Sequence, residues 1–240
     1  MKNIYDNSSF VLQVNNLTKV YDKKNHGVHN ASFNVKQGEF HAFIGENGSG
    51  KTTTIKSIIG AYYNFQGQIL IDNISNRKAE SKSILGYVPE STNFPKELTT
   101  YEYLNSFALL SGIPKSEIKD KIDYFLNKFN INDLRNLKPY NFSSGQKKKV
   151  LLIQALLTDP KLIILDEPSA YLDPTARFEL FQTLNELKSE GKTIFISTHV
   201  LAEVDKYADS LTLIHNGEIK YNGPKYDSLE NIFYEKVISN

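Results

Sequence analysis

The chain has 240 residues, of which 40% are apolar and 23% charged, with no cysteine and a formal net charge of +1. This composition is that of a globular protein with one large domain or two small ones. The lack of cysteine excludes a disulfide scaffold, a cysteine nucleophile and cysteine-ligated zinc, and the balanced charge provides no overall attraction to nucleic acid or anionic lipid. No apolar run reaches the length of a membrane span, and residues 1–9 lack the apolar stretch of a signal peptide.

Hydrophobic periodicity predicts an α/β fold. We expect strands over residues 11–14, 31–35, 40–44, 68–71, 162–165, 193–197 and 211–215, and helices over residues 51–59, 146–157 and 175–189. Apolar strands that alternate with helices are typical of a mainly parallel sheet covered on both faces.

A mainly helical segment interrupts this alternation. Thr99 and Glu102 have the spacing of a capping box, in which each residue bonds the backbone of the other at the start of a helix. The sequence therefore predicts one core in two parts, residues 1–90 and 158–240, and a helical insert over residues 91–157.

The chain between the strand at 40–44 and the helix at 51–59 contains a phosphate-binding motif. It reads Gly45, Glu46, Asn47, Gly48, Ser49, Gly50, Lys51 and Thr52, which fits G-x-x-x-x-G-K-[ST] in the required context. Backbone N–H groups and the positive end of the helix bind phosphate oxygens, while Lys51 supplies a charge for the β- and γ-phosphates and Thr52 a hydroxyl for Mg²⁺. A glycine-rich turn with an incidental lysine is the alternative, and the context favours nucleoside triphosphate binding.

Two acids follow the apolar strand at 162–165. Asp166 emerges at the carboxyl end of this strand, where ligands of open α/β sheets bind, and Pro168 cannot continue the strand. Adjacent strand residues point to opposite faces, so Asp166 and Glu167 have different roles unless the strand end bends. One carboxylate suits Mg²⁺ and the other suits an attacking water. The alternative, a solvated start of a loop, is disfavoured by the phosphate loop earlier in the chain.

A series of motifs occurs in one order between about residue 11 and residue 233. They are Tyr21 as an aromatic that stacks on adenine, residues 45–53 as a Walker A loop, residues 86–90 as a loop that usually ends in glutamine, residues 141–146 as a signature that usually reads Leu-Ser-Gly-Gly-Gln, Asp166 and Glu167 as Walker B and the catalytic glutamate, Leu172 and Asp173 as the end of the D-loop, and His199 as the switch histidine. These motif names and roles are those of the ATP-binding subunit of ATP-binding cassette (ABC) transporters, which the chain resembles; for this chain they are what the resemblance implies. The resemblance implies a P-loop NTPase core with a mainly parallel sheet, an antiparallel β-subdomain at the N-terminal side and an inserted α-helical signature subdomain.

The resemblance also implies ATP hydrolysis with ATP and Mg²⁺ as cofactors, and a role for each matching residue. The predicted catalytic residues are Glu167, which would polarise the attacking water, His199, which would contact the γ-phosphate, and Lys51. The predicted nucleotide-binding residues are Tyr21, Gly45, Glu46, Asn47, Gly48, Ser49, Gly50, Lys51, Thr52 and Thr53. The predicted Mg²⁺ ligands are Thr52, Glu90 and Asp166, and the predicted signature residues, which would contact ATP bound to the opposite protomer, are Ser143, Ser144, Gly145 and Gln146.

The family also implies partners. Two such chains pair head to tail, so we expect a homodimer or a heterodimer with another ABC ATPase, an integral membrane permease as partner, and a peripheral location at the cytoplasmic face of the cell membrane. Residues 93–104 and 227–233 resemble exporter-type ATPases, which favours export over import. The candidates for the groove that binds the permease are Phe94, Leu98, Tyr101 and Tyr103. The alternative is that these four side chains pack within the insert. The transported substrate is not predicted by the sequence.

Three residues depart from the usual pattern of the family. Ser144 replaces the first glycine of the signature and would shift that loop if the position needs a positive φ. Glu90 replaces a glutamine; its carboxylate can still bind Mg²⁺, although its charge opposes a γ-phosphate. Tyr171 stands where a small residue is common, which would alter contacts between subunits.

Two other functions stay open at this point. One is a soluble ABC ATPase that acts on ribosomes or DNA, but the sequence shows neither a second cassette nor long coiled coils. The other is a nucleotide-dependent module with little hydrolysis, which Ser144 and Glu90 favour and Glu167 disfavours. The three lysines at 147–149 could form a nucleic-acid patch, but without arginine or aromatic neighbours they indicate a solvated helix face, and no nucleic-acid partner is expected. Structural roles are expected for His26, His29, His41 and His215.

Overall fold

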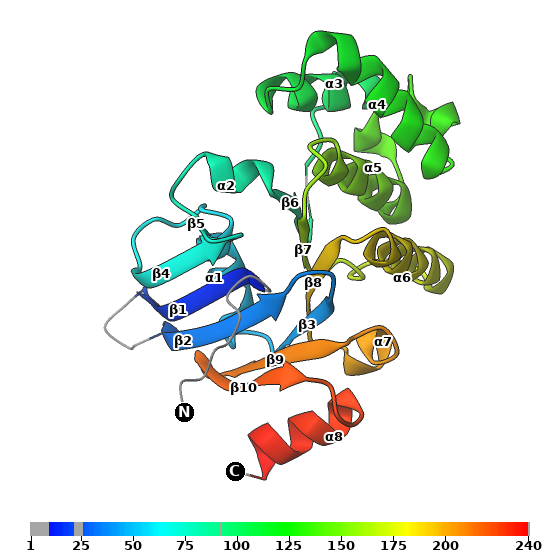
Figure 1. The fold of residues 1–240 in the computed structure, drawn as a ribbon. Coiled ribbons are helices and arrows are strands. Elements are labelled where there is room, and N and C mark those ends of the chain that lie inside the picture. The colour runs from blue at the N-terminus through cyan, green and yellow to red at the C-terminus, as the bar shows by residue number, and fades with distance from the viewer. Residues whose placement is uncertain (1–9, 22–25, 92, 240) are drawn as a thin grey trace.

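The computed structural model describes residues 10–21, 26–91 and 93–239. Residues 1–9, for which the absence of a signal peptide was predicted, lie outside this part. Two sheets lie together, and a group of helices extends from one end of them as an arm (Figure 1).

The larger sheet carries the predicted phosphate loop and the predicted carboxylates. Its strands, in the part of the chain that the structure describes, are β3 (Phe40–Ile44), β6 (Leu85–Val88), β7 (Leu162–Asp166), β8 (Thr193–Thr198), β9 (Ser210–His215) and β10 (Glu218–Pro224). They are ordered β10-β9-β3-β8-β7-β6, and all neighbouring pairs are parallel except β9 with β10. The predicted α/β fold with a mainly parallel sheet is therefore confirmed. β6 and the antiparallel edge strand β10 were not predicted as strands.

The smaller sheet is antiparallel, as predicted for the N-terminal side. Among the described residues it comprises β1 (Phe10–Val20), β2 (Gly27–Lys36), β4 (Gln66–Ile71) and β5 (Ile74–Ser75), in the order β2-β1-β4-β5. Asn222 of β10 connects this sheet to the larger one. Its side-chain amide accepts a hydrogen bond from the N–H of Asn34 on β2 (3.1 Å) and donates one to the carbonyl of the same residue (3.0 Å).

Helices cover the larger sheet and form the arm. Their bounds are α1 (Lys51–Ile58), α2 (Glu80–Ser83), α3 (Thr100–Leu110), α4 (Lys115–Lys128), α5 (Ser144–Leu156), α6 (Pro174–Ser189), α7 (Leu201–Val204) and α8 (Leu229–Phe233), with 3₁₀ turns at Asn132–Leu134 and Pro139–Asn141 and a π-helical turn at Tyr234–Ile238. The arm consists of α3, α4 and α5 (Figure 1). Thr99 and Glu102 form the predicted capping box at the start of α3. α5 begins two residues earlier than the predicted helix because Ser143, rather than a later residue, caps it.

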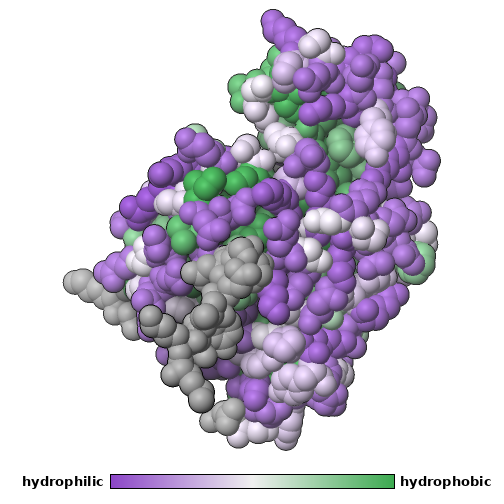
Figure 2. Space-filling model, in the orientation of Figure 1, coloured by the Kyte–Doolittle hydropathy of each residue, from purple (hydrophilic) through white to green (hydrophobic). Residues whose placement is uncertain are grey.

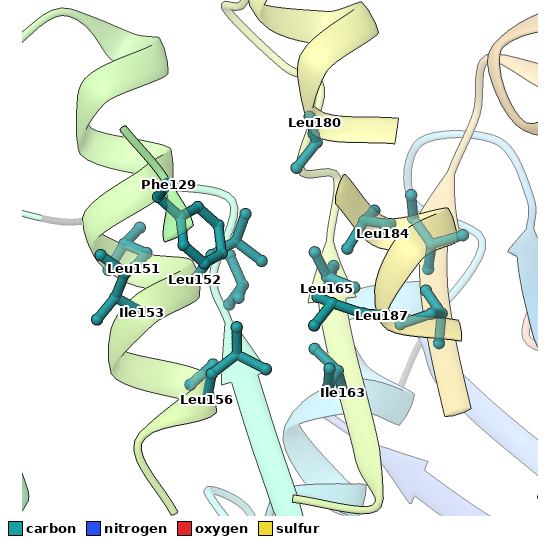
Figure 3. Close-up of a cluster of buried hydrophobic side chains, with 14 of the residues drawn as sticks. Phe129, Leu151, Leu152, Ile153, Leu156, Ile163, Leu165, Leu180, Leu184 and Leu187 are labelled. Atoms are coloured by element: carbon teal, nitrogen blue, oxygen red, sulfur yellow. The ribbon is translucent and has the colours of Figure 1, made fainter. Parts of the chain in front are cut away.

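Alternate residues of the larger sheet enter two different cores. Leu162 and Ile164 of β7 pack in a core with the smaller sheet and α1, whereas Ile163 and Leu165 pack in a core with the arm and α6. Leu156 of α5 and Ile163 of β7 both belong to this second core, on opposite sides of the cluster in Figure 3. Hydrophilic side chains cover most of the face seen in Figure 2. Because β7 is buried on both faces, the end of the strand that carries Asp166 has a defined position.

Candidate active site

The loop between β3 and α1 is the predicted phosphate loop. β3 is completely buried, which holds the start of the loop in place. Gly48 and Gly50 have φ values of 83° and 109°, which residues with a side chain rarely adopt. A Cβ atom at Gly50 would also lie 2.8 Å from Cγ2 of Val28. The conformation of the loop therefore depends on glycine at these positions.

Lys51 is the first residue of α1 and is 6% exposed. Its Nζ donates hydrogen bonds to the carbonyl oxygens of Gly45 (2.7 Å) and Glu46 (3.1 Å). The same atom lies 3.2 Å from Oε1 of Glu167. The ammonium group is thus held between the phosphate loop and the acid that follows β7.

A cavity of about 530 Å³ brings together most of the predicted nucleotide and catalytic residues. The predicted residues that line it are Tyr21, Glu46, Asn47, Gly48, Gly50, Lys51, Thr52, Thr53, Glu90, Glu167 and His199. His26 and Tyr171 also line it, although His26 was predicted to be structural. Gly45, Ser49 and Asp166 do not line this cavity; the first two belong to the same loop, and Asp166 is the last residue of β7. The volume is in the range of small-molecule and cofactor sites.

Tyr21 lies at the rim of this cavity and is 53% exposed. Its hydroxyl is 3.1 Å from Oγ1 of Thr53, on α1, and its ring meets the edge of Tyr62 with centroids 6.1 Å apart. Partial burial raises the pKa of Tyr21, and Tyr62 adds to this, while the bond to Thr53 opposes it. An exposed ring held in this way can stack on a flat base.

Asp166 and Glu167 share one partner, Ser197 of β8. The Ser197 hydroxyl donates a hydrogen bond to Oδ1 of Asp166 (2.6 Å) and accepts one from the N–H of Glu167 (3.0 Å). Glu167 has a φ of 41°, so the chain bends directly after the last strand residue. The expectation of different roles assumed an unbent strand end, so it cannot rest on strand alternation alone. Ser197 is completely buried and was not predicted as a functional residue.

Glu167 also joins the other two predicted catalytic residues. Its Oε2 lies 3.0 Å from Nδ1 of His199, while Oε1 faces Lys51. Glu167 therefore lies between Lys51 of the phosphate loop and His199, which follows β8. A carboxylate in this position can accept a proton from a water molecule in the cavity.

Glu90 follows β6 and is exposed in the cavity. Burial raises the pKa of Tyr87 on β6 to about 12, and the negative charges of Asp166 and Glu90 contribute to this shift. Asp166 and Glu90, the two predicted carboxylate ligands of Mg²⁺, thus both raise the pKa of the Tyr87 phenol. They follow the carboxyl ends of neighbouring parallel strands, at the same edge of the sheet. No group of three histidine, aspartate or glutamate side chains that could hold a metal occurs among residues 10–21, 26–91 and 93–239.

These residues nevertheless suit Mg²⁺. The hydroxyl of Thr52 and the carboxylates of Asp166 and Glu90 are the oxygen donors that Mg²⁺ prefers. Ser197 bonds one oxygen of Asp166, Oδ1. Mg²⁺ is usually bound by one or two carboxylates together with phosphates of the substrate and water, so a complete protein cage is not required.

The four predicted signature residues line two other cavities. Ser143 caps α5: its Oγ accepts a hydrogen bond from the N–H of Gln146 (3.3 Å), whose side chain accepts one from the N–H of Ser143 (3.1 Å). Ser143, Gly145 and Gln146 line a cavity of about 420 Å³ between α5 and α6. Ser144 lines a cavity of about 120 Å³ with Glu90 and Tyr171.

Two expectations about substituted residues can be compared with the structure. Ser144 is the first residue of α5 and has no positive φ, so serine here causes no shift of the loop. Tyr171 has a φ of 63° and is 79% exposed, beside both Glu90 and the larger cavity.

Lys148 corrects the prediction of a solvated helix face at residues 147–149. Lys147 and Lys149 are half-exposed, but Lys148 is 5% exposed, and its Nζ bonds the carbonyl oxygens of Pro89 and Glu90. The sequence could not distinguish these lysines, because each is polar and the buried face of α5 depends on where β6 and its loop lie.

The fold and this cavity define a P-loop ATPase, with a buried lysine of the phosphate loop facing a strand-end glutamate. The family model described as ABC transporter matches residues 28–170. The chain is 49% identical over 234 residues to a putative ABC transporter ATP-binding protein of Mycoplasma pneumoniae, covering 96% of this chain and 72% of that protein. The chain belongs to the ABC transporter family and is an ATP-binding and ATP-hydrolysing subunit of it.

Two solved structures share the fold. One, titled as the ATP-binding subunit of an ABC transporter, is 34% identical with a TM-score of 0.83 and coverage of 94% of this chain and 98% of that one. The other is CbiO1 from Clostridium perfringens, part of the ABC transporter complex CbiONQ, which is 29% identical with a TM-score of 0.80 and coverage of 96% and 93%. These relatives do not favour a ribosomal or DNA-acting ATPase or a module with little hydrolysis. Within the described parts of the chain, no helix is long and apolar enough to cross a membrane.

Proposed function

We propose that this chain pairs head to tail with a second cassette, and that ATP binds between the phosphate loop of one chain and the signature of the other. The observation that supports this is the separation of the two phosphate-seeking helix ends. Lys51 begins α1 inside the cavity of about 530 Å³, whereas Ser143 caps α5 beside a different cavity. A second chain can bring its own Ser143 to the first cavity, which would complete the set of donors around the γ-phosphate.

Within this pair we assign the following roles. Lys51 and the backbone of residues 45–50 bind the phosphates, and Tyr21 stacks on the base. Glu167 accepts a proton from the attacking water, and the contact with His199 holds the Glu167 carboxylate in place. His199 lines the same cavity, where it would contact the γ-phosphate.

Mg²⁺ would be held by Thr52 and Asp166, with Glu90 nearby. When bound, it neutralises charge that develops on the phosphates. Ser197 keeps the Asp166 carboxylate oriented for this role through the bond to Oδ1. In the proposed division of the chain, residues 1–90 and 158–240 supply these groups and residues 91–157 supply the signature.

Pairing is tested by complementation between two inactive variants. Lys51→Ala removes the phosphate contact and Ser143→Arg blocks the signature, so each should lower ATP hydrolysis by about a hundredfold or more. Mixed together, they form heterodimers with one intact site, because the unchanged Lys51 of one chain meets the unchanged Ser143 of the other. Steady-state phosphate release should therefore recover in the mixture.

The control carries both changes in one chain and is mixed with the wild-type chain. Every heterodimer in that mixture has both sites damaged, so the double variant should add no activity. Activity in the control mixture above that of the wild-type chain alone, or no recovery in the mixture of single variants, would contradict the head-to-tail pair.

We further infer that the pair energises an exporter at the cytoplasmic face of the cell membrane, with an integral membrane permease as partner. CbiO1, similar in fold, is part of a transporter complex, and residues 93–104 and 227–233 resemble exporter-type ATPases.

Phe94 is buried against Tyr103, with ring centroids 4.9 Å apart, whereas Tyr101 lies against the guanidinium of Arg135. Tyr101 is therefore our candidate for contact with the permease. A Tyr101→Glu variant that binds ATP should fail to co-purify with the permease from membranes; normal co-purification would contradict this role.

A further inference from the structure

Lys148 is a buried lysine where the arm meets the larger sheet. Its Nζ donates hydrogen bonds to the carbonyl oxygens of Pro89 (3.1 Å) and Glu90 (2.9 Å). The next lysine, Lys149, instead forms an ion pair with Glu179 at 3.0 Å, with both side chains partly exposed. Lys148 thus binds the backbone of one loop rather than a surface acid.

An ammonium group is costly to bury, and an aliphatic side chain would fill the same space without that cost. Burial lowers the pKa of Lys148 to about 8, and the charges of Glu90 and Asp166 act in the opposite direction. The hydrogen bonds of the amine, and not the volume of the side chain, therefore explain why a lysine occupies this buried position.

These bonds close the arm at its base. Pro89 and Lys148 are 59 positions apart, and the chain between them includes α3, α4 and the start of α5. The loop that leaves β6 is thereby attached to the helix that Ser143 caps.

Glu90 connects this attachment to the nucleotide cavity. Its side chain lines the cavity of about 530 Å³, while its carbonyl oxygen bonds Lys148. Glu90, Ser144 and Lys148 also line the cavity of about 120 Å³ together. A displacement of Glu90 toward or away from a nucleotide would therefore act on α5 through one side chain.

We propose that Lys148 is a positioning residue for ATP hydrolysis, which holds Glu90 and the signature helix α5 in one fixed relation. Glu90 then reaches the nucleotide of its own chain when Ser143 and Ser144 reach that of the opposite chain. The inference rests on the proposed pair of cassettes, because only a second chain gives the signature a nucleotide to contact.

The test compares ATP hydrolysis by the full-length wild-type chain with Lys148→Met, Lys148→Arg and Lys121→Met. Lys148→Met should lower kcat by about tenfold or more, while KM for ATP changes by less than about threefold because the phosphate loop is intact. Lys148→Arg should recover most of kcat, since a guanidinium can donate to both carbonyls. Lys121→Met, the control on α4 of the arm, breaks an ion pair with Glu117 away from these cavities and should retain the wild-type kcat.

A role in stability alone would give a different pattern. Melting temperatures identify variants that lose fold, and if Lys148→Met does not fold, Lys148→Gln, which keeps a donor without the charge, takes its place. Combined with Glu90→Ala, Lys148→Met should add little further loss, because Lys148 acts on the nucleotide by fixing the backbone that carries the Glu90 side chain; fully additive losses in kcat would overturn the proposal.

A folded Lys148→Met protein with the wild-type kcat would also overturn it. The complementation experiment separates this outcome from failure of the proposed function. If Lys51→Ala and Ser143→Arg restore activity together but Lys148→Met hydrolyses ATP normally, the pair stands and the role of Lys148 does not.

Discussion

The two helix ends proposed to bind phosphate in this chain are built in different ways. The phosphate loop lies between the completely buried strand β3 and α1, and its Lys51 contacts Glu167, which directly follows β7. The signature begins α5 in the arm, where Ser143 and Gln146 cap each other. The first site is set by long-range burial and the second by a local cap together with Lys148. A site at the ends of buried strands is therefore rigid in advance, whereas a site on an arm needs attachment.

The largest effect expected from this difference is at Ser197. Ser197→Ala removes the bond to Asp166 and one acceptor for the N–H of Glu167, so kcat should fall about 10- to 100-fold and more Mg²⁺ should be needed for half-maximal rate. Phosphate release measured across a Mg²⁺ titration checks this. Ser106→Ala, the same change on α3 of the arm, is the control and should leave both quantities unchanged. A Ser197→Ala protein with a normal Mg²⁺ requirement would refute preorganisation by the strands.

A smaller effect concerns the stability of the sheet region in acid. His41 of β3 is completely buried between Ser210 and Thr212, each 2.8 Å from a ring nitrogen, and burial lowers the pKa of His41 to about 3. The unfolded chain binds this proton below pH 6.5, so the stability is complete above that pH and is lost as pH falls toward 3. The loss should reach about 2 kcal/mol at pH 5.

Urea unfolding at pH 5 and pH 8 measures this loss. His41→Gln has no titrating group here, so the difference between the two pH values should shrink by about the same amount. If the free energy of unfolding differed between pH 5 and pH 8 by the same amount in His41→Gln as in the wild type, His41 would not cause the loss of stability in acid.

The smallest effect is on the affinity for ADP. Glu167→Gln removes the charge that faces Lys51 at 3.2 Å, which frees the ammonium for phosphate and removes repulsion of the nucleotide. Affinity for ADP, measured by calorimetry, should rise by about fivefold. Because ADP is the product, hydrolysis does not disturb the measurement. Glu179→Gln breaks an ion pair with Lys149 outside this cavity and should leave the affinity unchanged; equal effects of the two substitutions would contradict the argument.

Features that depend on neighbouring residues could be predicted from the sequence. The strand at 40–44, the helix that follows it and the capping box of Thr99 and Glu102 depend on local pattern, and each is found. The bend after Asp166 was not predicted; the sequence indicated only that without a bend Asp166 and Glu167 would point to opposite faces.

Features that depend on distant partners could not. Ser197 is one of many serines, and its role arises because β8 lies beside β7. Lys148 was taken for a solvated residue because its neighbours are lysines, and its burial depends on the loop after β6. The assignments of the nucleotide, metal and signature residues stay predictions that the proposed experiments test.

Asn222 has a consequence for the behaviour of the protein at high concentration. β2 and β10 are the outermost strands of their sheets, and an outermost strand offers free backbone groups to other chains. By bonding both the N–H and the carbonyl of Asn34, the Asn222 amide replaces the backbone of a missing neighbour. One side chain thereby blocks strand addition to β2 at Asn34.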